Sequence, residues 1–113
     1  MIIEPTTRKL IGKVFPVSWD AALALRDLGL EFFLLIGRNS TLDNQLEKTL
    51  VSFIQHYSLA LYVVTVSIVD YPDAASQLGV AYLPQVRLYR NGKEAGRHRG
   101  LATYALLHEI VGR

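Results

Sequence analysis

The chain has 113 residues, of which 50% are hydrophobic and 19% are charged. This composition is typical of a single globular domain and excludes a disordered, highly charged tail protein. The formal net charge of +2 is too small to imply a nucleic-acid partner by itself. The chain has no cysteine, which excludes disulfides, thiolate nucleophiles and zinc ribbons made by this chain alone.

Neither a membrane span nor an export signal is apparent in the sequence. The longest apolar stretch, residues 59–69, is shorter than the roughly 18 residues that a membrane-spanning helix needs. The first nine residues place an acid and a proline where a signal peptide has its apolar core. We therefore expect a cytoplasmic protein. His56, His98 and His108 lack metal-binding spacing, so we expect no metal and no cofactor.

The N-terminal part predicts a strand, a helix and a second strand. We expect a short strand within Lys9 to Val17, bounded by Pro16. Ser18 is placed to cap a helix that ends near Gly29. The continuous apolar run from Glu31 to Ile36 predicts a buried parallel strand, because neither of its faces is polar.

The middle of the chain predicts a long helix, a strand and a short helix. Apolar residues at intervals of three and four indicate an amphipathic helix from Thr41 to His56. Either Asn39 or Ser40 can cap this helix. The β-branched run from Leu59 to Val69 predicts a second buried strand, and residues 74–78 predict the short helix.

The C-terminal part predicts a hairpin and a last helix. We expect strands from Gln85 to Arg90 and from Lys93 to Arg99, joined by a turn at Asn91-Gly92. Gly96 indicates a bulge in the second strand or a position at the sheet edge, and residues 104–111 predict the helix. The order β-α-β-α-β-α-β-β-α predicts an α/β fold with a central mixed sheet flanked by helices. We expect one domain, residues 1–113.

This order and several short motifs resemble the thioredoxin family. A core strand ends in Asp70, Leu83-Pro84 stands where thioredoxins have a cis-proline, and Asn91-Gly92 follows as in their last hairpin. The resemblance covers residues 31–113, whereas residues 1–30 match poorly. It implies the thioredoxin fold and a cis bond before Pro84. In that family the backbone beside this proline pairs with an extended peptide, a form of strand addition.

The redox machinery of the family is missing from this sequence. Counting back from Asp70 without gaps places Thr41 and Asn44 at the positions of the two cysteines, and Leu35 at the position of the buried acid. Dithiol exchange needs a thiolate that attacks a disulfide sulfur, and a hydroxyl near neutral pH cannot do this. We therefore expect a redox-inactive member that is not an enzyme and that binds protein, as an adaptor or assembly chaperone.

The candidate partner-binding residues form three groups. They are the loop in place of the redox motif, the segment at the proline, and a polar pair on the strand that follows it. Arg87 on that strand needs water, an acid or another chain. We weigh a sheet face left open for a partner or a homodimer against an arginine that reaches solvent past its neighbour. The residues are Arg38, Asn39, Ser40, Thr41, Leu42, Tyr82, Leu83, Pro84, Arg87 and Tyr89.

Two other functions stay open on the sequence. A hydroxyl of Ser40 or Thr41 could bind glutathione or another small molecule and activate a thiol near the helix start, although helix capping also explains both residues. The basic hairpin from Arg87 to Arg99 could follow a nucleic-acid backbone. Basic residues on a hairpin are also the usual protection against edge-to-edge aggregation, and we expect no nucleic-acid partner.

Overall fold

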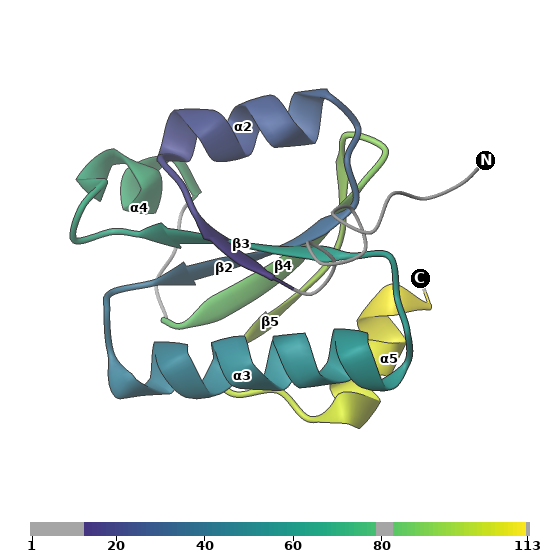
Figure 1. The fold of residues 1–113 in the computed structure, drawn as a ribbon. Coiled ribbons are helices and arrows are strands. Elements are labelled where there is room, and N and C mark those ends of the chain that lie inside the picture. The colour runs from purple at the N-terminus through teal and green to yellow at the C-terminus, as the bar shows by residue number, and fades with distance from the viewer. Residues whose placement is uncertain (1–12, 79–82, 113) are drawn as a thin grey trace.

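A five-stranded mixed sheet runs through the computed structural model, which describes residues 13–78 and 83–112 (Figure 1). Its spatial order is β1-β3-β2-β4-β5. The first three strands in that order run parallel, whereas β4 is antiparallel to both β2 and β5. The strands are β1 (Val14–Pro16), β2 (Phe32–Gly37), β3 (Tyr62–Ser67), β4 (Gln85–Arg90) and β5 (Lys93–Arg99).

Helices cover both faces of this sheet (Figure 1). The helices α2 (Trp19–Asp27) and α4 (Pro72–Leu78) lie on one face, and α3 (Thr41–His56) and α5 (Tyr104–Val111) lie on the other. Among the described residues, no helix is both long enough and apolar enough to cross a membrane.

The two faces of β2 enter two separate apolar layers. Phe33 and Leu35 pack with residues of α3 and α5, whereas Phe32, Leu34 and Ile36 pack with residues of α2 and α4. Every residue of β2 is buried. This confirms the sequence prediction of a buried strand. A strand that is covered on both sides needs apolar residues at every position.

The predicted helix starts are confirmed by their caps. The side chain of Ser18 accepts a hydrogen bond from the backbone N–H of Ala21, and that of Thr103 accepts one from Leu106. Each bond satisfies a backbone N–H that has no partner inside the helix. The short helix α4 begins at Pro72 rather than at the predicted Ala74, since a proline is well suited to the first position of a helix.

The hairpin follows the sequence prediction. Asn91 and Gly92 have φ values of 54° and 79°, as a tight turn between antiparallel strands requires. The register shifts from Leu88 opposite Gly96 to Tyr89 opposite Glu94, which confirms the predicted bulge. β3 is shorter than the predicted strand, since it covers residues 62–67, whereas β1 covers residues 14–16 within the predicted range. Residues 9–12 of the predicted first strand lie outside the described residues.

Candidate functional site: one end of the sheet

Two of the predicted partner-binding groups lie at the same end of the sheet. Ile36 pairs with Gln85 across β2 and β4, so the loop that leaves β2 runs beside the segment that enters β4. The Leu83–Pro84 peptide bond is cis. The Pro84 carbonyl accepts a hydrogen bond of 2.7 Å from the N–H of Gly100, which ties this segment to the end of β5. We call residues 38–42 with 83–84 the docking edge; Tyr82, predicted with them, lies outside the described residues.

The Asp43 carboxylate organises the loop of the docking edge. It accepts hydrogen bonds from the backbone N–H of Arg38 at 2.7 Å and of Ser40 at 3.2 Å. The Ser40 hydroxyl donates to the same carboxylate at 2.8 Å and accepts from the N–H of Asp43 at 3.2 Å. Asn39, between Arg38 and Ser40, has a φ of 60°, which lies in the left-handed region. The loop is therefore held by a capping box whose acid also binds the residues before the helix.

This arrangement is poorly suited to binding a thiol or an anion at the start of α3. The Ser40 hydroxyl already donates to Asp43, so it cannot donate the same hydrogen to a ligand. Asp43 is only 8% exposed, and its negative charge would repel a thiolate placed beside it. The side chain of Thr41 is exposed at the helix start. These contacts count against glutathione activation at this loop.

The role of Asp43 in this loop was missed from the sequence. The signal in the sequence is Ser40 followed three residues later by Asp43, which is the spacing of a capping box. That spacing predicts the bonds between these two residues. The additional bond to Arg38 depends on the path of the loop, which no local pattern specifies.

Apolar side chains are exposed at this end of the sheet, in the first turn of α3 and in the loop after β3. The N–H of Ile68 donates to the Gly37 carbonyl at 2.9 Å, which joins the loop after β3 to the loop after β2. Leu42, in the first turn of α3, is 44% exposed, and Val69 and Tyr71, after β3, are 61% and 38% exposed. These apolar side chains are available for contact with another molecule.

A polar cleft of about 300 Å³ lies between these two loops. It is lined by Asn39 and Glu47 on one side and by Asp70 and Tyr71 on the other, and it reaches Thr65 in the sheet. Its described lining contains two carboxylates and no lysine or arginine. The cleft therefore favours a positively charged group over a negatively charged one.

The structure corrects the expectation of an open sheet face at Arg87 and Tyr89. Arg87 is only 5% exposed, so its guanidinium does not reach solvent. Its Nε donates to Gln85 at 2.7 Å and lies 3.5 Å from the Glu94 carboxylate. Tyr89 is 6% exposed and stacks on Phe32 with 5.5 Å between ring centroids. Both side chains belong to the interior, so neither is part of a surface for a partner or a second copy.

Two arginines of the basic hairpin are held by acids of the same chain. Arg90 donates to Glu31 at 3.0 Å and to the Val111 carbonyl at 3.0 Å. Arg97 forms an ion pair with Glu94 at 2.8 Å. These arginines are held in place by acids of the same molecule, which weakens the case for a nucleic-acid backbone at this hairpin.

Comparison with family models and with curated protein sequences finds no match. Among solved structures, a chain from a study of thiol resolution in a yeast mitochondrial 1-Cys peroxiredoxin by glutathione and thioredoxin systems has a TM-score of 0.75 and 17% identity, over 89% of this chain and 96% of that one. Mitochondrial thioredoxin 3 from Saccharomyces cerevisiae has a TM-score of 0.73 and 17% identity, over 95% of this chain and 99% of that one. Chloroplastic thioredoxin z has a TM-score of 0.73 and 22% sequence identity, over 99% of this chain and 95% of that one.

These similarities show the fold of the chain. The sheet order, the flanking helices and the superpositions define the thioredoxin fold, which the sequence predicted. The chain carries no cysteine, so its own residues cannot supply the thiolate that dithiol exchange requires. It is therefore a cysteine-free chain on a fold shared with thioredoxins.

Proposed function

We propose that this protein is a non-catalytic interaction module that binds an extended segment of another protein at the docking edge. The observation that carries the proposal is at Leu83, whose backbone N–H and carbonyl form no hydrogen bond with the described residues. An extended peptide can satisfy both groups by adding a short strand. The side chain of Leu42 is exposed in the first turn of α3, directly after the loop that leaves β2, and offers an apolar contact for the same peptide.

The chemistry of the surrounding surface supports a preference for one kind of partner. The cleft that adjoins the docking edge carries the carboxylates of Glu47 and Asp70. A segment that places an apolar residue on Leu42 and a lysine or arginine in this cleft complements both features. We therefore expect an extended, basic partner segment. Such binding needs no catalytic group, in keeping with a protein that acts as an adaptor or assembly chaperone.

A displayed library of random peptides, selected on the immobilised protein, tests this proposal directly. The affinity of a selected peptide is then measured by fluorescence anisotropy for the wild type, Leu42→Glu and Leu28→Glu. Leu28 is 75% exposed and follows α2 at the opposite end of β2, so it is a matched control. Leu42→Glu adds an acid to the first turn of α3, a position where acids are tolerated, so folding is expected to be retained.

We expect Leu42→Glu to weaken the selected peptides by about tenfold or more, the size of a well-packed apolar contact. Leu28→Glu should leave their affinity unchanged. The proposal fails if both variants bind like the wild type, or if no basic peptide is enriched. Selected peptides that match a segment of this chain's own sequence would instead indicate a homodimer.

A further inference from the structure

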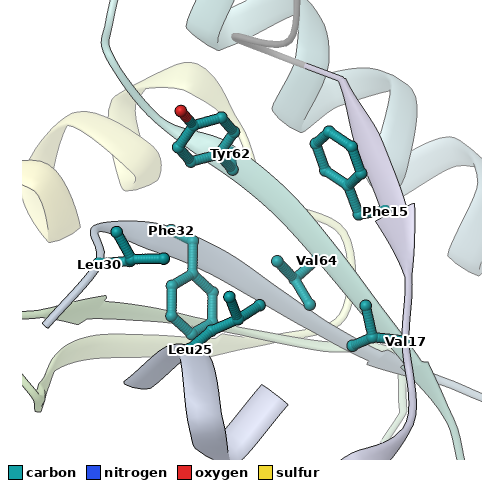
Figure 2. Close-up of a pocket in the computed structure, with 7 residues that line it drawn as sticks. All are labelled: Phe15, Val17, Leu25, Leu30, Phe32, Tyr62 and Val64. Carbon is teal, nitrogen blue, oxygen red and sulfur yellow. The ribbon is translucent and has the colours of Figure 1, made fainter. Parts of the chain in front are cut away.

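A second concave site lies at the end of the sheet opposite to the docking edge. It is a pocket of about 390 Å³ between α2 and the sheet, and Figure 2 shows the side chains around it. Phe32 and Tyr62 are the first residues of β2 and β3, so the pocket lies where these parallel strands begin. Leu25 of α2 and Leu30 of the following loop close it from the helix side.

The described walls of this pocket are apolar throughout. The rings of Phe15, Phe32 and Tyr62 and the aliphatic side chains of α2 and β3 line it. The one polar side-chain group among these residues is the Tyr62 hydroxyl, which Figure 2 shows directed away from the other lining side chains. Phe15 and Tyr62 meet edge to face with 6.1 Å between centroids. A buried charge without a partner is costly, so the enclosed part of any ligand must be neutral.

The size and surroundings of the pocket fit a small molecule better than a protein. Small-molecule sites span roughly 300–1,000 Å³ and combine apolar walls with few polar groups, and this pocket of about 390 Å³ falls within that range. The residues that follow Leu25 and Leu30 in the chain are charged, and each forms an ion pair. Arg26 binds Asp27 at 3.1 Å, and Glu31 binds Arg90 at 3.0 Å. These charges therefore do not enter the pocket lining, which is apolar.

We propose that this pocket binds a small neutral molecule with an aromatic or short aliphatic body. The body would contact the rings of Phe15 and Phe32, which line the pocket. This binding site contains none of the residues of the docking edge, although Val17 lines both this pocket and the polar cleft beside that edge. A failure of one proposal therefore leaves the other standing.

The probe for this proposal is 2-naphthol, which is neutral near pH 7 and carries one hydroxyl. It is titrated into the full chain labelled at methyl groups, and the methyl resonances are followed by NMR. We expect saturable shifts at Val17, Leu25, Leu30 and Val64, with a dissociation constant of about 1 mM or tighter. Methyl groups of Leu42, at the docking edge, should not move.

One variant and two controls make the test specific. Leu25→Trp places a larger ring in the pocket and is expected to weaken 2-naphthol binding by about tenfold or more. Leu42→Trp, at the other end of the sheet, should bind like the wild type. Tyr62→Phe keeps the ring and removes only the hydroxyl, which points away from the other lining side chains, so it should bind 2-naphthol like the wild type. Circular dichroism checks that each variant is folded.

Several results would overturn the proposal. Shifts that do not saturate, or that spread over exposed leucines elsewhere, would show that 2-naphthol has no defined site. Equal binding by Leu25→Trp and the wild type would place the ligand outside this pocket. Nuclear Overhauser contacts between the lining methyl groups and residues 1–12, recorded without 2-naphthol, would mean that the chain itself occupies the space.

Discussion

Gly37 is expected to tolerate no side chain, because Asp43 occupies the space that a Cβ would need. A methyl group on Gly37 would overlap the Asp43 carboxylate. The φ of Gly37 is not in the left-handed region, so alanine could adopt its backbone, and the overlap is the whole difficulty. The carboxylate is held by the N–H of Arg38 and of Ser40 and by the Ser40 hydroxyl. Gly37→Ala must therefore displace Asp43 from these partners.

The magnitude follows from the hydrogen bonds that are lost. A hydrogen bond to a charged group contributes roughly 1.5–3 kcal/mol, and part of this is regained when the freed backbone groups meet water. We expect Gly37→Ala to lower the free energy of unfolding by about 2–4 kcal/mol. Asp43→Ala should cost about 2–3 kcal/mol for the same reason. In the Asp43→Ala background the overlap is gone, and Gly37→Ala should change stability by less than about 1 kcal/mol.

Urea unfolding of the wild type, both single variants and the double variant measures this coupling. Circular dichroism gives the free energy of unfolding for each of the four proteins. We expect the double variant to be more stable than the sum of the two single effects by about 2 kcal/mol or more. If the two effects add within about 0.5 kcal/mol, Asp43 is not what excludes a side chain at Gly37, and our account of the loop is wrong.

Three further stability predictions use the same urea assay. Ser40→Ala removes the cap of α3 and should cost about 1–2 kcal/mol, whereas Thr41→Ala, at an exposed position, should change stability by less than about 0.5 kcal/mol; equal effects would contradict the capping role. Arg87→Ala leaves the buried Gln85 side chain without this donor and should cost about 2 kcal/mol, but Arg97→Ala, 46% exposed, should cost less than about 1 kcal/mol. Phe53→Ala, at a site with 0% exposure, should cost about 3–5 kcal/mol, and a loss under about 1 kcal/mol would refute its place in the core.

Residues that interact with near neighbours were predictable from the sequence. The start of α3 follows from Ser40 and the apolar spacing after it, and the hairpin follows from Asn91-Gly92. In both cases the partners are three or fewer residues apart, so a local pattern contains the whole interaction. The thioredoxin fold itself was recognisable because the order of such local elements admits few topologies.

The environment of Arg87 was not predictable in this way. The sequence indicates that Arg87 shares a strand with Gln85, but the approach of Glu94 depends on the bulge that shifts β5 by one residue. A shift of one residue moves a side chain to the other face of the sheet. Without that register, an arginine open to solvent and one paired inside the chain fit the sequence equally well.

The sequence by itself determined the element order, the caps, the buried central strand and the absence of a thiol. Only the tertiary structure decided that Arg87 and Tyr89 are interior, and that α2 stands over the strand starts with a pocket beneath it. The physical reason is the range of the forces involved. Capping and periodicity act within a few residues, whereas burial and pocket shape depend on surfaces that folding brings together from distant parts of the chain.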